Sequence, residues 1–217
     1  MARSKTSKAW MQEHVSDPYV RRARAEGYRS RAAYKLLELN RRDHLLRPGL
    51  TVVDLGSAPG GWSQVAAEQV GAAGRVLAVD RLEMAPIQGV AFILGDFRDQ
   101  ATLERLAGTL GERRADLVLS DMAPNISGVP EVDQARSLEL VQAVVEFCQG
   151  YLKPGGTLLV KVFQGAGFEE FATGLRRRFL KVAVRKPGAS RSRSPEVYLL
   201  ASGFRGPARA TEEGDSV

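Results

Sequence analysis

Short apolar runs alternate with longer amphipathic stretches over most of the chain. The apolar runs predict strands buried on both faces, because they are rich in valine and leucine and lack a strict polar alternation. These strands are expected at residues 51–55, 75–80, 91–94, 115–121, 156–162, 179–184 and 196–202. Apolar residues spaced by three and four positions predict helices at 31–44, 62–71, 99–109, 133–151 and 166–177, and a turn near 82–88.

The order of these elements predicts an α/β fold. Strands that alternate with helices are typical of a mostly parallel sheet covered by helices on both faces, so we expect a Rossmann-like, seven-stranded sheet. The last strand follows the Ser-, Arg- and Gly-rich loop 187–195 without a crossover helix, and it is therefore expected to be antiparallel. Residues 21–204 are expected to form a single domain, between a basic, mobile arm (1–20) and a disordered tail (205–217).

A glycine-rich loop follows the first predicted strand. Residues 52–62 read Val-Val-Asp-Leu-Gly-Ser-Ala-Pro-Gly-Gly-Trp, and glycine lets a backbone turn approach a nucleotide closely because it has no Cβ. The spacing does not match the Gly-x-Gly-x-x-Gly of dinucleotide sites. Asp54 places a carboxylate beneath the loop, which a sulfonium-bearing ligand tolerates better than a pyrophosphate does. The loop resembles the first motif of S-adenosylmethionine-dependent methyltransferases; a plain strand–loop–helix turn is the alternative.

Aspartates also end the next three predicted strands. They are Asp80, Asp96 and Asp121, in order along the chain. Because the carboxyl ends of parallel strands line the ligand crevice, these carboxylates are expected to lie together. Asp80 suits the ribose hydroxyls of a nucleoside, and Asp96 suits an adenine amino group with Phe97 packed against the ring. A single aspartate at a strand end is often only a cap or a turn former, but four in succession favour a shared site.

Two lysines and a glutamate stand out because of their surroundings. Lys161 lies inside the apolar strand Leu158–Phe163, and a lysine is rarely buried without a partner, so it is expected to reach a site at the strand's end. Lys35 lies on the helix before the first strand, and Glu196 opens the last strand. Taken alone, Lys35 is an ordinary surface lysine and Glu196 an ordinary strand-opening charge.

Charge is distributed unevenly along the chain. Residues 1–42 carry a formal charge of +7, residues 43–170 carry −7 and residues 171–217 carry +6. The basic ends include Arg41 and Arg42 as well as the run Arg176–Arg178. Single-sign runs of this kind favour a nucleic-acid partner, because a solvated helix face normally mixes both signs.

Several classes of protein are disfavoured by what the sequence contains. The single cysteine, Cys148, allows neither an internal disulfide nor a cysteine metal cluster, and it is expected in the core. His14 and His44 are too isolated to indicate a metal site. No apolar run approaches the ~18 residues that span a bilayer. The basic first ten residues lack the apolar run of a secretory signal, so a cytoplasmic location is expected.

Six segments together form a more specific pattern. They are Ser30–Lys35, Asp54–Gln64, Gly95–Arg98, Ser120–Asn125, Lys161–Gly165 and Ser190–Tyr198. In order and content they resemble the FtsJ/RlmE family of ribosomal RNA 2′-O-methyltransferases, over roughly residues 8–204. The resemblance implies S-adenosylmethionine as the methyl donor. As substrate it implies a uridine ribose in the peptidyl-transferase region of 23S rRNA, preferentially in the assembled large ribosomal subunit.

The resemblance also assigns residues to roles. It places a catalytic tetrad on Lys35, Asp121, Lys161 and Glu196, with Lys161 as the proton acceptor. Together with the glycine loop, it assigns cofactor binding to Gly56, Gly60, Trp62, Asp80, Asp96 and Asp121. The arginines expected to contact RNA on either side of the site are Arg29, Arg31, Arg176, Arg177, Arg191 and Arg193. A monomer is expected, although no residue pattern determines the oligomeric state.

The chemistry of methyl transfer agrees with these roles. A 2′-hydroxyl is a poor nucleophile and must lose its proton as it attacks, and only RNA offers that hydroxyl. Lys161 can accept a proton only when its amine is neutral. The positive charge of Lys35 favours the neutral amine and the two carboxylates favour the charged one, so the sequence leaves the direction of the net pKa shift open. Methyl transfer to oxygen needs alignment and a base rather than a Lewis acid, so no metal is expected. Two alternatives are an NAD-linked reductase and a non-catalytic RNA-binding ribosome-assembly factor.

Overall fold

The computed structural model describes residues 17–191 and 194–207. Within these residues the strands are β1 (Thr51–Leu55), β2 (Arg75–Asp80), β3 (Val90–Leu94), β4 (Ala115–Ser120), β5 (Leu152–Phe163), β6 (Phe179–Arg185) and β7 (Glu196–Phe204). The helices are α2 (Pro18–Glu26), α3 (Ala32–Asp43), α4 (Gly61–Val70), α5 (Gln100–Leu110), α6 (Pro130–Tyr151) and α7 (Phe168–Arg178).

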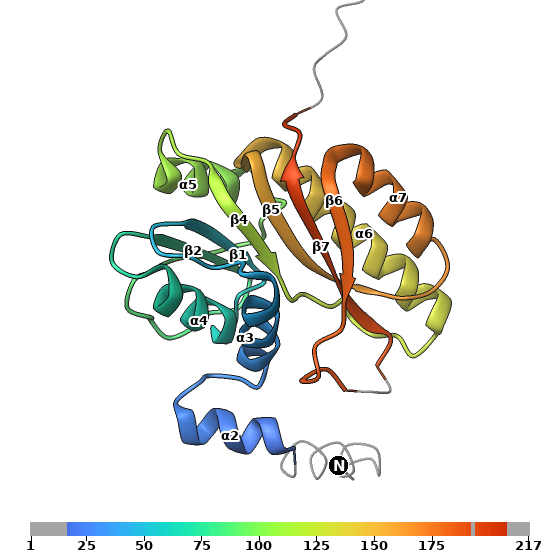
Figure 1. Cartoon of the computed structure of the whole chain (residues 1–217), viewed down its shortest axis with the longest axis horizontal. Helices are drawn as coiled ribbons and strands as arrows, with labels where there is room; N and C mark the ends of the chain where they lie inside the picture. Colours follow the sequence, from blue (N-terminus) through green and yellow to red (C-terminus); the bar gives the residue numbers. More distant parts are fainter. Residues whose placement is uncertain (1–16, 192–193, 208–217) are drawn as a thin grey trace, which may run out of the picture.

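The strands form one seven-stranded sheet in the order β3–β2–β1–β4–β5–β7–β6 (Figure 1). The strands from β3 to β5 pair in parallel, whereas β7 runs antiparallel to both of its neighbours, β5 and β6. The predicted Rossmann-like sheet with an antiparallel last strand is confirmed. Chain order reverses direction between β1 and β4, and in sheets of this type a ligand crevice opens at that reversal.

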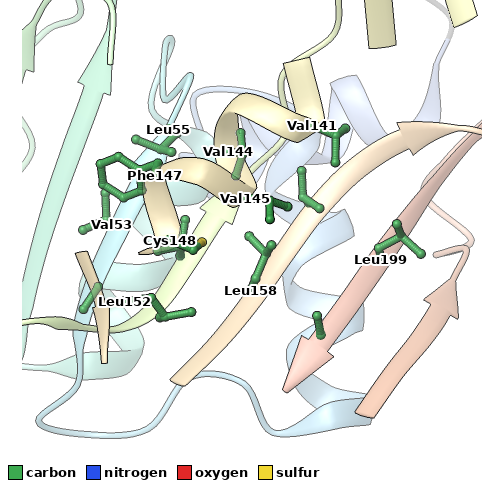
Figure 2. Close-up of a cluster of buried hydrophobic side chains, with 14 of the residues drawn as sticks. Val53, Leu55, Val141, Val144, Val145, Phe147, Cys148, Leu152, Leu158 and Leu199 are labelled. Atoms are coloured by element: carbon green, nitrogen blue, oxygen red, sulfur yellow. The ribbon is translucent and has the colours of Figure 1, made fainter. Parts of the chain in front are cut away.

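Helices cover both faces of the sheet, as the sequence predicts. On one face α3 and α4 pack over a core that includes Leu36, Trp62 and Leu159. On the other face α5, α6 and α7 cover a second core. Figure 2 shows the α6 side chains of this second core beside the strands, and Cys148 lies fully buried among them, as expected. Among the described residues, no helix is both long enough and apolar enough to cross a bilayer.

Helix α2 is absent from the predicted elements. The Asp17 carboxylate caps its start by accepting the backbone N–H of Tyr19 at 2.9 Å, and Gly27 ends it with a φ of 80°. Asp-Pro at the start and glycine after the end are standard helix signals, but the basic composition of this stretch hid them. The predicted arm 1–20 therefore overlaps α2 from residue 18. Residues 1–16, and the predicted tail from residue 208 onward, lie outside the described residues.

Two boundaries differ from the predicted ones by more than two residues. β5 begins at Leu152, which pairs with Ala115, rather than at residue 156. Pro154, Gly155 and Gly156 are residues that favour turns, but in the structure a shift of register between β4 and β5 keeps the strand continuous. Helix α6 begins at Pro130, where proline suits the first helical turn, rather than at residue 133.

The centre of the sheet is expected to dominate stability. Leu159 is fully buried in β5, so Leu159→Ala should lower the free energy of unfolding by about 2–5 kcal/mol, because apolar burial decreases and a cavity is left behind. Leu180 lies on the edge strand β6 and is 71% exposed, so Leu180→Ala is the matched control and should change stability by less than about 0.5 kcal/mol. Urea unfolding followed by circular dichroism measures both values. Equal losses of stability in the two variants would contradict the dominant role of the central strands.

Candidate active site

A cavity of about 610 Å³ opens at the carboxyl ends of the parallel strands, where the strand order reverses. Its wall includes Gly56 after β1, Asp80 at the end of β2, Asp96 after β3 and Asp121 after β4. The sequence therefore correctly predicted that three of the four aspartates share one site. A cavity of this volume lies within the ordinary range for small-molecule sites.

The glycine-rich loop after β1 lies against the loop after β4, and both loops form part of the cavity wall. Gly56 has a φ of 75°, a conformation that residues with a Cβ rarely adopt. A Cβ at Gly56 would also overlap the side chain of Met122, which lies on the loop after β4. Glycine at this position therefore allows the side chain of Met122 to pack directly against the loop after β1.

Asp80 and Asp96 already accept hydrogen bonds from the protein. Asp80 accepts the backbone N–H groups of Ala58 and Leu82, each at 2.8 Å, and so it shapes the glycine loop as well as lining the cavity. Asp96 accepts two bonds from the Arg98 guanidinium, at 2.9 and 2.5 Å. These bonds from Arg98 hold the pKa of Asp96 below its usual range, although burial opposes the shift. Asp96 is therefore an ionised acceptor at neutral pH, and a carboxylate has lone pairs left for a ligand.

Asp54 does not line the cavity. It lies inside β1, is 1% exposed, and accepts a hydrogen bond of 2.6 Å from the Ser63 hydroxyl of α4. Burial, with smaller contributions from the negative charges of Asp121 and Asp80, raises the pKa of Asp54 to about 7. The sequence placed this carboxylate beneath the glycine loop, among the acids of a shared ligand site; in the structure it joins β1 to α4 instead.

Gly60 and Trp62 also stand apart from the cavity wall. Gly60 is the N-cap of α4 and lies beside the Arg29 side chain. Trp62 is 3% exposed, donates its indole N–H to the Ala32 carbonyl at 2.8 Å, and packs its ring against Tyr198. Both residues lie at the start of α4, where they contact α3 and the residues just before it, and neither lines the large cavity.

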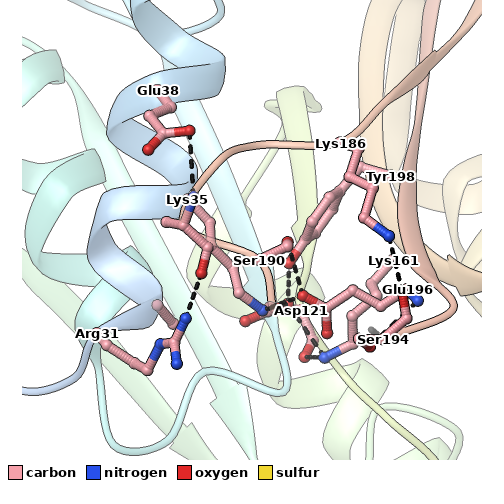
Figure 3. A network of polar contacts seen from close by, with 12 residues as sticks. Arg31, Lys35, Glu38, Asp121, Lys161, Lys186, Ser190, Ser194, Glu196 and Tyr198 are labelled. Atoms are coloured by element: carbon pink, nitrogen blue, oxygen red, sulfur yellow. Dashed lines mark hydrogen bonds and ion pairs between the residues drawn. The ribbon is translucent and has the colours of Figure 1, made fainter. Parts of the chain in front are cut away.

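The four residues of the expected tetrad come together from four separate elements (Figure 3). The Lys161 ammonium, on β5, lies 3.1 Å from Oδ1 of Asp121 and donates to the main-chain carbonyl of Asp121 at 2.6 Å. The Lys35 ammonium, on α3, lies 2.6 Å from Glu196 and 3.6 Å from the same Oδ1 of Asp121. Both lysines are 8% exposed, so each is buried together with a charged partner.

Two further residues complete this cluster, and sequence reasoning assigned them no role. The Tyr198 hydroxyl donates to Oδ1 of Asp121 at 2.5 Å, and the Ser190 hydroxyl donates to Oε1 of Glu196 at 2.8 Å. Tyr198 could have been found, because it lies two positions after Glu196 on a strand and so shares its face. Ser190 lies in a loop, where no periodicity indicates the direction of a side chain.

The electrostatics of the cluster favour a charged Glu196 carboxylate and a neutral Tyr198 phenol. Burial alone would raise the pKa of Glu196, but the charge and hydrogen bond of Lys35 outweigh it, with help from Lys161 and Ser190, and lower that pKa. Burial and the negative charges of Asp121 and Glu196 raise the pKa of Tyr198 well above its ordinary value. Tyr198 therefore stays protonated and acts as a hydrogen-bond donor.

A second, smaller cavity of about 270 Å³ lies on the other side of the cluster. Its wall includes Lys35, Glu196, Arg31 and Arg191. Asp121 lines the large cavity and Lys35 lines the small one, and these two residues form an ion pair. The charged cluster therefore lies between the large cavity, which has room for one small molecule, and the small cavity, which has room for a group of a second molecule.

The arginines expected to contact RNA differ in their surroundings. Arg29 donates to the carbonyls of Pro59, Ala85 and Pro86, and Arg31 binds the Asp17 carboxylate and the Ala189 carbonyl, so both guanidinium groups hold the protein's own loops. Arg191 lines the small cavity, and Arg193 lies outside the described residues.

The expectation that residues 176–193 lie together beside the site is wrong for Arg176 and Arg177. These arginines precede Phe179, which pairs with Phe204 at the far end of β7 from Glu196. Helix α7 begins at the edge of the sheet where β5 ends, which is also the edge of the tetrad, and it ends at the opposite edge, because a crossover helix returns the chain to the start of the next parallel strand. The basic run in its last turn is therefore remote from the tetrad.

The fold and the site together define a class of protein. A sheet of this order, with a glycine loop after β1 and acidic residues at or just after the ends of β2, β3 and β4, is that of the S-adenosylmethionine-dependent methyltransferases. The model of the FtsJ-like methyltransferase family matches residues 28–204. The chain belongs to this family.

Individual relatives agree with this assignment. The chain is 58% identical to "Ribosomal RNA large subunit methyltransferase E" of Nitrosospira multiformis and 60% identical to the protein of that name from Azoarcus sp., over 94% of this chain and 100% of each relative. A solved Plasmodium falciparum structure, described as a ribosomal RNA methyltransferase, aligns with a TM-score of 0.74 and 31% identity over 82% of this chain and 100% of that one. Aeropyrum pernix fibrillarin, solved with bound S-adenosylmethionine, shares the fold, with a TM-score of 0.55 and 18% identity over 78% and 73% of the two chains.

The residues of the large cavity suit S-adenosylmethionine. Gly56 lets the backbone of the loop after β1 form part of the wall, and Asp80, Asp96 and Asp121 provide acceptors for hydroxyl and amino groups and negative charge for a positive sulfonium. When bound, this cofactor supplies the activated methyl group. The residue set therefore fits the cofactor of the family.

The raised pKa of Asp54 leads to a prediction about stability and pH. Between about pH 4 and pH 7 the folded protein holds a proton on Asp54 that the unfolded chain has released, so this group makes the free energy of unfolding fall as pH rises. Asp54→Asn removes this contribution. Relative to the unchanged protein, the variant should gain up to a few kcal/mol as pH rises through this window.

Urea unfolding at several pH values between about 4.5 and 7.5 measures this difference across the expected titration. Subtracting the two curves removes the contributions of all other titrating groups. Ser63→Ala serves as the control, because it removes the hydrogen bond from Ser63 but keeps the carboxyl and should therefore retain the pH dependence. Parallel pH curves for Asp54→Asn and the unchanged protein would show that Asp54 titrates normally.

Proposed function

We propose that this protein transfers the methyl group of S-adenosylmethionine to the 2′-hydroxyl of a uridine in 23S rRNA, with Lys161 as the general base. The observation that carries the proposal is the position of the charged cluster between the two cavities. Asp121 lines the cavity that fits the cofactor, and Lys35 and Glu196 line the one that would receive the ribose. Lys161 is bound to Asp121 at the junction.

Each side chain then has a distinct task. Lys161 would take the proton of the 2′-hydroxyl, and the ammonium that forms would be stabilised by the carboxylate and carbonyl of Asp121. The cofactor, held at Asp80, Asp96 and Asp121, would supply the methyl group and leave as the thioether S-adenosylhomocysteine. Lys35 and Glu196 would hold and orient the ribose. Ser190 and Tyr198 keep Glu196 and Asp121 in place, since each donates one hydrogen bond to its carboxylate.

The identity of the substrate rests on chemistry and on the relatives. A buried base next to a small cavity suits an alcohol nucleophile, and the 2′-hydroxyl distinguishes RNA from DNA. The relatives are named as methyltransferases of large-subunit ribosomal RNA, and this supports the same RNA here. The assembled large subunit as the form of the substrate, a cytoplasmic location and action as a monomer are further parts of the proposal.

Replacing Lys161 tests the base directly. Lys161→Ala should lower the rate of methyl transfer by on the order of 10²–10⁴-fold, the usual contribution of a general base. Lys161→Arg keeps the positive charge but cannot lose a proton near neutral pH, so it should be equally inactive. The assay follows labelled methyl from S-adenosylmethionine into large ribosomal subunits from cells that lack this protein, with the product digested and identified as a 2′-O-methyl nucleotide.

The matched control is Lys181→Ala, which removes an exposed lysine from the edge strand β6 and should leave the transfer rate nearly unchanged. Calorimetric titration with S-adenosylmethionine confirms that each variant retains its cofactor site. Activity in Lys161→Arg would show that Lys161 serves as a cation rather than as a base. Tight subunit binding without methyl transfer by the unchanged protein would instead favour the ribosome-assembly factor.

A further inference from the structure

A basic groove of about 230 Å³ lies between the end of α3 and the loop that follows β6. Its wall includes Arg41, Arg42 and Lys186, together with Glu38. We propose that this groove, called here the α3 groove, holds backbone phosphates of the RNA strand next to the methylated ribose. This proposal rests on the proposed function, because the strand that enters the α3 groove is the RNA strand whose ribose is methylated.

The sheet register places the α3 groove at the catalytic edge. Lys161 of β5 pairs with Tyr198 of β7, and Tyr198 pairs with Arg185 of β6. Adjacent strands lie about 4.8 Å apart, so Arg185 is level with Lys161 and about 10 Å from it across the sheet. Arg185 binds Asp43 at the end of α3 through a pair of hydrogen bonds, and this contact brings the end of the helix to the same edge.

Helix geometry connects the α3 groove to the reacting centre. Lys35, Glu38 and Arg42 are separated by three and four positions, so they lie along one stripe of α3. A rise of about 1.5 Å per residue puts Arg42 about 10 Å beyond Lys35. A strand whose ribose reaches Lys35 therefore brings neighbouring phosphates to the α3 groove.

The charges in the α3 groove are arranged for an external anion. Arg41 and Arg42 are exposed, and neither makes a hydrogen bond or an ion pair with any residue that the structure describes. The acidic groups nearby are already engaged: Asp43 pairs with Arg185, and Glu38 accepts the backbone N–H of Gly188 at 2.6 Å. The α3 groove thus presents two available guanidinium groups, which suit phosphate oxygens.

The chain supplies a matched comparison at the other edge of the sheet. Arg176 and Arg177 are also exposed and also lie in the last turn of a helix. They precede β6 at the Phe204 end of β7, and the eight steps from Glu196 to Phe204 span about 26 Å. Both pairs have the same formal charge and lie in the last turn of a helix, and the main difference is their distance from the tetrad; Arg176 also donates a hydrogen bond to the Thr173 hydroxyl at 3.3 Å.

The experiment compares the double variants Arg41→Gln/Arg42→Gln and Arg176→Gln/Arg177→Gln in the full chain. Equilibrium binding to large ribosomal subunits from cells lacking the protein is measured over a series of KCl concentrations. The α3 pair should weaken binding by about tenfold or more and lower the slope of log affinity against log salt by about 1–2, one for each phosphate that is no longer neutralised. The α7 pair should change affinity by less than about twofold, because it touches no phosphate.

Two further measurements separate this proposal from the catalytic one. Affinity for S-adenosylmethionine and the rate of methyl transfer at saturating subunits should match the unchanged protein in both double variants, because no changed residue touches a reacting atom. Equal effects of the two pairs on binding, or no effect of the α3 pair, would overturn the role of the α3 groove. If the Lys161 variants kept their activity, Lys161 would not be the base. The comparison of the two arginine pairs would still test the α3 groove.

Discussion

One oxygen atom, Oδ1 of Asp121, lies within ion-pair or hydrogen-bond distance of three side chains of the candidate active site. Lys161 approaches it from β5, Lys35 from α3, and Tyr198 from β7. The lysines and the tyrosine are buried, and a buried charge without a partner is costly, so this one carboxylate lets all three lie beneath the surface together. Every other feature of the site is arranged around the position of Asp121 at the end of β4.

That position depends on the topology of the sheet. β4 lies beside β1 at the reversal of strand order, so the residue after β4 lines the cavity that the glycine loop after β1 also lines. The antiparallel β7 then returns beside β5 and delivers Glu196 and Tyr198 to the same edge as Lys161. A parallel last strand would begin at the opposite edge, and its first residues would not reach the tetrad.

The arginines show that net charge alone does not identify a nucleic-acid surface. Arg29, Arg31 and Arg185 use their guanidinium groups to hold loops and helix ends that frame the active site. Arg41 and Arg42 are available at the catalytic edge, whereas Arg176 and Arg177 carry the same charge at the opposite edge. The electrostatic attraction of RNA to a basic protein is general, but productive contacts depend on which guanidinium groups remain available near the tetrad.

The sequence by itself determined the chain order of the seven strands and of the helices from α3 to α7, the antiparallel last strand, and the aspartates at or just after the ends of β2, β3 and β4. These features follow from local rules: apolar periodicity, connection length and the placement of acids at strand ends. The role of the tetrad came from the resemblance of its motifs, because Lys35 and Glu196 look ordinary alone. Only the tertiary structure decided that Asp54 and Trp62 support the site from within the core and that Ser190 joins Glu196. The tertiary structure alone also placed Arg41 and Arg42 at one edge of the sheet and Arg176 and Arg177 at the opposite edge. Contacts between residues distant in the chain depend on how helices and strands pack, and no local sequence pattern specifies that packing.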